Sequence, residues 1–176
     1  MIIELIERLT QEAAKRDIDF LLIGGQAIGI LGHLRQTMDI DFLVLASSRP
    51  GWEELLGVYG YHCFSEGKAF AQFEGKTGWP RIDLMMVDDA TFAKLRADAV
   101  ETNGKRTPSP RHMVALKLHA TRGADRHPDK SNQDWIDIRK LIELHKLDPN
   151  EEIFAALIRR YGGEEGLERV RQMCQI

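Results

Sequence analysis

The sequence predicts an α/β (α+β) fold in which a mixed β-sheet is packed by helices and followed by a C-terminal helical bundle. Three observations lead to this prediction. An apolar run of strand length at residues 19–23 stops at a glycine pair, and residues 38–45 have the pattern of a second strand. Beyond Pro108-Ser109-Pro110 the apolar spacing is helical. We therefore expect a core domain over residues 1–107 and a helical subdomain over residues 108–176.

The expected elements of the core follow from local patterns. Apolar residues at helical spacing begin at Ile2, and Lys15-Arg16 suit the C-terminal end of that helix. Gly24-Gly25 permits a tight turn and a close approach of the backbone to a ligand. The short apolar helix that follows would direct its first amides at an anion. The expected elements are a helix from residue 2, a strand at 18–23, a short helix at 26–31, a strand at 38–45, a helix at 52–59, strands at 61–64, 69–73 and 81–87, and a helix at 88–99.

Composition sets limits on function. The chain has 176 residues, of which 43% are hydrophobic and 29% charged, as is usual for a globular protein. Its net charge of −3 argues against a generally basic surface for nucleic acid. We expect no membrane span and no signal peptide, and the absence of a C-x-x-C pair favours a cytoplasmic location. Basic residues outnumber acids over 105–130, which suits either a polyphosphate or RNA-end substrate or a solvated helix face.

Asp39 and Asp41 are two residues apart in the second expected strand, so both carboxylates should leave the same face. Two neighbouring acids on a half-buried strand repel each other, and a divalent cation would relieve the repulsion. The alternative is that one acid pairs with Arg35 while the other is solvated. Arg35 itself could contact phosphate, neutralise the acids or cap the preceding helix. Thr37 is expected to pack or hydrogen-bond at the strand edge.

A third acid, Asp83, lies inside the apolar run at residues 82–87. A third carboxylate on a neighbouring strand is what a two-metal site requires. The alternative is a salt bridge to Arg81 or Arg35.

The second half of the chain is expected to be helical. Ser109 and Pro110 suit the start of a helix that reaches Arg122, and Lys117 in that helix either extends to solvent or reaches an anion. We expect a charged, mobile loop at 123–130 and a capping box formed by Ser131 and Asp134. Asp134 and Asp137 would then complement the helix dipole. Further helices are expected at about 148–160, with Asp148 as the cap, and at 164–174, separated by Gly162-Gly163.

The stretch from residue 18 to 44 resembles the signature of the polymerase-β-like nucleotidyltransferase superfamily, in which a strand, a glycine pair and a short helix precede D-x-D. The resemblance implies that Gly24 and Gly25 hold nucleotide phosphates, and that Asp39 and Asp41 bind catalytic metal. It also implies that Asp83 completes the metal site and acts as general base for the attacking hydroxyl.

A second block, residues 115–138, resembles the AbiEii-type nucleotidyltransferases, the toxin components of certain toxin–antitoxin systems. The resemblance implies that Lys117 and Arg122 bind nucleotide phosphates and that Asp134 and Asp137 support the active site. Gln133 stands where that pattern has a lysine, and Lys130 could compensate.

These resemblances imply an enzyme that uses Mg²⁺ or Mn²⁺ to transfer a nucleoside monophosphate from a nucleoside triphosphate to a hydroxyl. The acceptor could be an RNA 3′ end, a protein or a small molecule, and an antitoxin protein would be a partner. Two alternatives stay open: a non-catalytic nucleotide-binding or partner-regulated module, and a metal-dependent phosphohydrolase. The expected site residues are Asp39, Asp41 and Asp83 for metal and catalysis, Gly24, Gly25, Arg35, Thr37, Lys117 and Arg122 for the nucleotide, and Asp134 and Asp137 in support.

Overall fold

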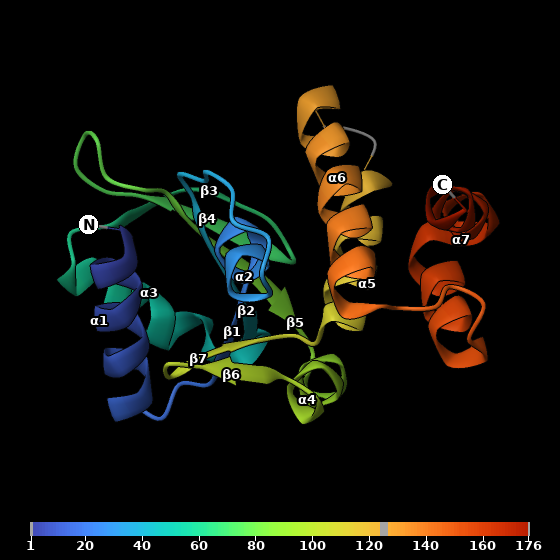
Figure 1. The fold of residues 1–176 in the computed structure, drawn as a ribbon. Helices are drawn as coiled ribbons and strands as arrows, with labels where there is room; N and C mark the ends of the chain where they lie inside the picture. The colour runs from blue at the N-terminus through green and yellow to red at the C-terminus, as the bar shows by residue number, and fades with distance from the viewer. Residues whose placement is uncertain (1, 124–126, 176) are drawn as a thin grey trace. The chain divides into compact units, whose positions relative to one another are not determined.

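The computed structural model describes residues 2–123 and 127–175. The chain forms two compact units, each with its own internal packing (Figure 1). The core unit comprises residues 1–30 and 34–108, and the helical unit comprises residues 31–33 and 109–176. The three residues 31–33 therefore belong to the helical unit although both of their neighbours in sequence belong to the core unit.

The core unit is built on a five-stranded sheet with the strand order β1-β2-β5-β4-β3. The central pair β2 and β5 is parallel, and the other pairs are antiparallel, which confirms the predicted mixed sheet. The strands are β1 (Phe20–Ile23), β2 (Ile40–Leu45), β3 (His62–Glu66), β4 (Phe70–Glu74) and β5 (Ile82–Val87). A separate hairpin pairs β6 (Val100–Thr102) with β7 (Lys105–Thr107).

Helices α1 and α3 pack on one face of this sheet and close the main hydrophobic core. Every second residue of β2 and β5 faces this core, as period-2 side-chain alternation requires. Phe20, Phe42 and Trp52 form an aromatic cluster within it, with ring centroids 4.9–5.8 Å apart. The helices of the core unit are α1 (Ile2–Lys15), α2 (Gly24–Ile30), α3 (Arg49–Val58) and α4 (Asp89–Ala97), and a short 3₁₀ turn, η1, spans Ala46–Ser48.

The helical unit contains α5 (Pro110–Thr121), α6 (Pro128–His145) and α7 (Glu152–Cys174), and α5 packs against both of the others. Ser109 caps α5 and Pro110 opens it, as predicted. The glycine pair does interrupt the last helical segment, because Gly163 has a non-helical backbone with φ 73°. No helix among the residues described is long and apolar enough to cross a membrane.

Four local predictions are wrong. Helix α6 begins at Pro128 with His127 as its cap, so Ser131 and Asp134 form no capping box. The same early start places residues 128–130, predicted as loop, in the first helical turn, while residues 124–126 of that loop lie outside the described part of the chain. Strand β2 begins at Ile40, so Asp39 precedes the strand. The last helix takes Glu151 as its cap instead of Asp148.

Candidate active site

Asp41 and Asp83 lie side by side at the centre of the sheet. They are register partners in the parallel pair β2–β5, and both are half-buried. Their neighbours Ile40, Phe42 and Ile82 point into the hydrophobic core, so the two carboxylates leave the opposite face. Adjacent carboxylates in a partly shielded site repel each other, and this arrangement favours binding of a cation.

The glycine that follows β1 fits closely against the first of these acids. Gly24 has φ +65°, and a Cβ atom built on it would lie 1.9 Å from Oδ2 of Asp41. Any side chain at this position would therefore collide with the carboxylate as well as strain the backbone. The glycine pair was expected to allow a ligand to approach, and at Gly24 the group that approaches is the side chain of Asp41.

Gly25 and Thr37 make a similar contact. A Cβ atom on Gly25 would lie 2.8 Å from both Cβ and Oγ1 of Thr37. The side chain of Thr37, which precedes the acids in sequence, therefore packs directly on the glycine turn. Four of the predicted site residues, Gly24, Gly25, Thr37 and Asp41, are thus brought together by tight packing.

Gln72 was not predicted as a site residue. It is the register partner of Asp83 on β4, and its Nε2 donates a hydrogen bond of 3.1 Å to Oδ2 of Asp83. This bond orients the carboxylate and satisfies one of its oxygen atoms. The sequence shows only an isolated amide side chain between Ala71 and Phe73. Its role depends on the pairing of β4 with β5, which sequence neighbours do not reveal.

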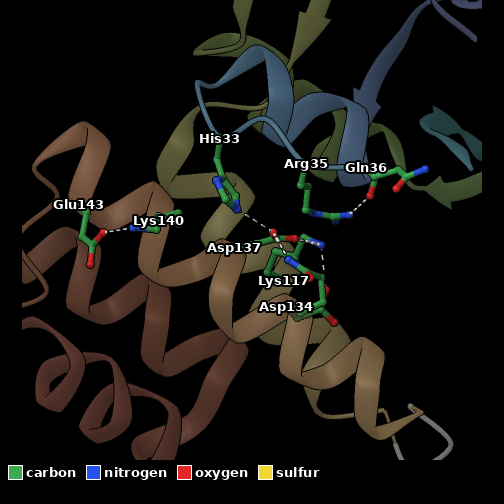
Figure 2. A network of polar contacts seen from close by, with 9 residues as sticks. His33, Arg35, Gln36, Lys117, Asp134, Asp137, Lys140 and Glu143 are labelled. Atoms are coloured by element: carbon green, nitrogen blue, oxygen red, sulfur yellow. Dashed lines mark hydrogen bonds and ion pairs between the residues drawn. The ribbon is translucent and has the colours of Figure 1, made fainter. Parts of the chain in front are cut away.

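The other two residues of the predicted core site lie in the segment that precedes β2. Asp39 is half-buried and comes one residue before the strand. Arg35 is also half-buried, and its Nη1 atom lies 3.4 Å from the backbone carbonyl of Gln36, to which it donates (Figure 2).

The donor set fits a hard divalent cation. Within residues 2–123 and 127–175, no three His, Cys, Asp or Glu side chains converge as a ready metal cluster. Magnesium, however, commonly takes one or two carboxylates and completes its shell with water and substrate phosphates. The pair Asp41 and Asp83 meets that requirement, and Asp39 is close in sequence to supply a further oxygen.

In the helical unit, Lys117 forms the centre of a buried ion-pair network. Its Nζ lies 2.8 Å from Oδ1 of Asp134 and 2.8 Å from Oδ2 of Asp137 (Figure 2). The three residues are 8%, 1% and 0% exposed. Of the two alternatives predicted for Lys117, solvent or an anion, the structure shows the second. The anions are two carboxylates of the same unit.

The network explains both aspartates and the unusual glutamine. Asp134 and Asp137 lie beyond the first turn of α6, where the helix dipole has little effect, so the dipole account of these acids is wrong. Gln133 donates a 3.0 Å hydrogen bond to Oδ1 of Asp137, and His33 Nε2 lies 3.9 Å from the same atom. Arg122, by contrast, is exposed at the C-cap of α5.

Two cavities lie away from the predicted residues. One of about 590 Å³ is lined by residues of α3, β3 and β4 and by Tyr61, which lies between α3 and β3; Arg49 and Phe64 are among them. Another of about 380 Å³ is lined by residues that include Thr10, Asp19 and Arg106. Neither contains any of the predicted site residues.

Comparison with solved structures identifies the fold. The chain is similar to ANT(2")-Ia, solved in complex with adenylyl-2"-tobramycin, with a TM-score of 0.68 at 20% identity, covering 90% of this chain and 98% of that one. It is similar to the lincomycin-bound lincosamide antibiotic adenylyltransferase LnuA, with a TM-score of 0.59 at 16% identity, covering 82% and 98%. It is also similar to the polyadenylate synthase of Megavirus, with a TM-score of 0.58 at 14% identity, covering 84% of this chain and 33% of that one.

No protein-family profile matches the chain, and no curated protein sequence does. At these low identities the structural likeness defines the fold. The chain has the polymerase-β-like nucleotidyltransferase fold, a mixed five-stranded sheet with C-terminal helices, as the glycine pair and D-x-D predicted.

Proposed function

We propose that this protein is a metal-dependent nucleotidyltransferase that transfers a nucleoside monophosphate from a nucleoside triphosphate to a hydroxyl of a small molecule. The observation that carries the proposal is the position of Asp41, which lies beside Asp83 on one side and against Gly24 on the other. Paired carboxylates next to a glycine turn, on this fold, suit binding of a triphosphate and its cation.

Each residue is assigned a role. Asp39, Asp41 and Asp83 would hold Mg²⁺ or Mn²⁺, which when bound neutralises negative charge on the phosphates. Gly24, Gly25 and Thr37 would form the turn on which the triphosphate rests, and the guanidinium of Arg35 would donate to its oxygens. Gln72 keeps Asp83 in place through the 3.1 Å hydrogen bond.

The reaction is a displacement at the α-phosphorus. The acceptor hydroxyl oxygen forms a bond to that phosphorus, the bond to the β-phosphate bridging oxygen breaks, and pyrophosphate leaves with the bonding electron pair. Asp83 is assigned as the base that takes the acceptor's proton. The products are an acceptor phosphodiester, pyrophosphate and one proton.

The structural similarities support a small acceptor over an RNA end. The chain corresponds to 98% of ANT(2")-Ia and of LnuA, but to only 33% of the polyadenylate synthase. The net charge of −3 also gives no general attraction to RNA. ANT(2")-Ia was solved with adenylyl-2"-tobramycin, and LnuA is a lincosamide antibiotic adenylyltransferase solved with lincomycin. Hydroxylated antibiotics are therefore the first acceptors to test.

Arg122, at the C-cap of α5, is proposed to contact phosphate, because the residue is exposed. For Lys117 we propose the role of internal counter-ion, since binding a phosphate would require it to give up a carboxylate at 2.8 Å. Asp134 and Asp137 then act as its structural partners.

A role as the toxin of an AbiEii-type pair, with an antitoxin partner, is a second proposal. It rests on the spacing of Lys117, Arg122, Asp134 and Asp137. Growth arrest on induction that disappears in Asp41→Asn would support it, whereas unaffected growth with active enzyme would contradict it.

For either proposed function we propose a cytoplasmic location. Cys63 and Cys174 are both free and exposed, which suits a reducing compartment.

The test uses α-labelled nucleoside triphosphates, Mg²⁺ and separate pools of aminoglycosides, lincosamides, total RNA and total protein. We expect a labelled small-molecule product and an equal amount of pyrophosphate from the wild type, and neither from Asp41→Asn. Asp89→Asn, at an exposed position on α4, is the matched control and should retain full activity. Release of labelled nucleotide into water would indicate a phosphohydrolase, and stable binding of Mg-triphosphate without any product would indicate a non-catalytic module.

A further inference from the structure

The face of the sheet that carries Asp41 and Asp83 continues over β4 and β3, which follow β5 in the strand order (Figure 1). The register places Gln72 of β4 beside Asp83, and Ser65 of β3 beside Gln72. Register partners on adjacent strands direct their side chains to the same face. One row of side chains therefore runs from the two acids of the candidate site to β3, the strand at the edge of the sheet.

The proposed reaction assigns a different ligand to each end of this row. Gly24 lies against Asp41, and β1, which the glycine follows, is the neighbour of β2 on the side away from β5. In phosphoryl transfer the attacking and leaving oxygens lie roughly in line, on opposite sides of the phosphorus. With the triphosphate on the glycine turn, the acceptor would approach from the side of Asp83, over β4 and β3.

Arg81 supplies a cation on the side of the acceptor. It is exposed and lies directly before β5, two residues from Asp83, so the alternation of side chains directs both to one face. Its Cζ lies 5.1 Å from the ring centroid of Phe64 on β3, so the side chain extends across β4. A ring contact uses none of the five N–H donors of a guanidinium. Phe64 therefore holds the charge in place without consuming its capacity to bind an anion.

The surroundings of Arg81 suit a small polar ligand. The Phe64 ring that supports it is 40% exposed. Glu74, two residues beyond Gln72 on β4, has its Oε1 atom 3.4 Å from Nε2 of His62 on β3, so this acid is directed towards the edge of the sheet. Strands β5 and β3 are about 10 Å apart, or two strand spacings, a distance that a sugar with an acidic substituent can span.

We infer that the sheet face over β4 and β3 is the acceptor subsite, and that Arg81, held by Phe64, selects an acceptor with a carboxylate or phosphate group. The inference rests on the proposed function and names its substrate class: a hydroxylated small molecule that carries an acidic group, in preference to a polycation such as an aminoglycoside. All the residues that form this subsite belong to the core unit.

The test measures transfer from Mg-ATP to four related sugars: glucuronate and glucose 6-phosphate, which are anions, neutral glucose, and cationic glucosamine. For the wild type we expect kcat/KM to be about five- to tenfold higher for the anions than for glucose, and lowest for glucosamine. Comparison of the two anions distinguishes a carboxylate from a phosphate. Arg81→Gln should abolish the preference and Arg81→Glu should reverse it. The KM for Mg-ATP should stay constant, because the triphosphate is assigned to the other side of Asp41.

Three further variants make the test specific. Phe64→Leu removes the ring and should weaken the preference for anions, whereas Phe64→Tyr should keep it. Arg8→Glu is the matched control, because Arg8 is exposed on α1, the helix that packs on the opposite face of the sheet. This variant should rank the four sugars as the wild type does.

Transfer by the wild type without an advantage for the anions would overturn the inference alone. So would an Arg81→Glu variant that keeps the wild-type ratio of kcat/KM between glucuronate and glucosamine. A wild type that transfers nucleotide to an antibiotic but to neither anion would also overturn it. A wild type that yields no product with any acceptor, these sugars and the earlier pools included, refutes the proposed function and the inference together.

Discussion

Oδ2 of Asp41 occupies space within 1.9 Å of the point where Gly24 would carry a Cβ atom. A carboxylate of the candidate site and a left-handed glycine are thereby fitted to each other. This contact explains why the turn after β1 requires glycine even without a bound ligand.

Gly24→Ala should lower both stability and activity. The left-handed backbone alone costs about 1–2 kcal/mol for a residue with a side chain, and the new methyl group must also displace Asp41. Urea denaturation measures the first effect and nucleotide transfer the second. Gly57→Ala on α3, where a Cβ atom would meet nothing within 4 Å, is the control. It should stabilise the protein slightly, by about 0.5–1 kcal/mol. Equal stability of the two variants would contradict the prediction.

Gln72 is expected to support the chemistry of Asp83. Gln72→Ala removes the donor to Oδ2 and should lower kcat by about ten- to a hundredfold, since a hydrogen bond to a charged group contributes about 1.5–3 kcal/mol. Gln72→Glu should be worse, because it places a second carboxylate beside Asp83. Glu74→Gln, farther along the same strand, serves as the comparison in the transfer assay. A Gln72→Glu variant with wild-type kcat would rule out this role.

Lys117 is expected to be essential for stability. Lys117→Met leaves Asp134 and Asp137 buried without their shared cation and should cost about 3–5 kcal/mol in the free energy of unfolding. Asp137→Asn should cost less, because one carboxylate remains to pair with the ammonium. Urea titrations of the three proteins decide the point. If Lys117→Met instead kept its stability and lost only nucleotide affinity, the lysine would be a phosphate ligand.

We expect the protein to lose stability at alkaline pH because of Tyr61. Burial raises the pKa of this phenol to about 12, and its hydroxyl donates a 3.0 Å hydrogen bond to the carbonyl of Pro80. The unfolded chain ionises this group near pH 10, so the stabilisation is complete below that pH and is lost as pH rises from about 10 to 12. Urea unfolding between pH 8 and pH 12 should show this decline. Tyr61→Phe should flatten the decline, and Tyr59→Phe should leave it in place.

Local sequence patterns predicted the parts of the structure that depend on local chemistry. Strand β5 (Ile82–Val87) lies within the strand expected at residues 81–87, and the helix expected from residue 88 is α4, which Asp88 caps by accepting a hydrogen bond from the backbone amide of Thr91. The helix start at Ser109-Pro110 was equally clear. In each case the residues that define the element are neighbours in sequence.

The errors and omissions arose where a distant partner or a weak cap decided the outcome. Helix α6 begins at Pro128 with His127 as its cap, three residues before the capping box that was predicted from Ser131. The pairing of Lys117 with two aspartates on α6 and the bond from Gln72 to Asp83 depend on how separate elements meet. The metal and nucleotide assignments themselves stay predictions, which the transfer assay tests.

The inclusion of Leu31–His33 in the helical unit has a consequence for recombination. The boundary at Pro108 looks like a place to graft a new C-terminal half onto the core unit. A chimera that exchanges residues 109–176 alone would remove His145, whose Nε2 lies 2.8 Å from the backbone carbonyl of Leu31, and would leave that carbonyl without its donor. The transferable cassette is discontinuous: it consists of the C-terminal helices together with three residues from the middle of the core sequence.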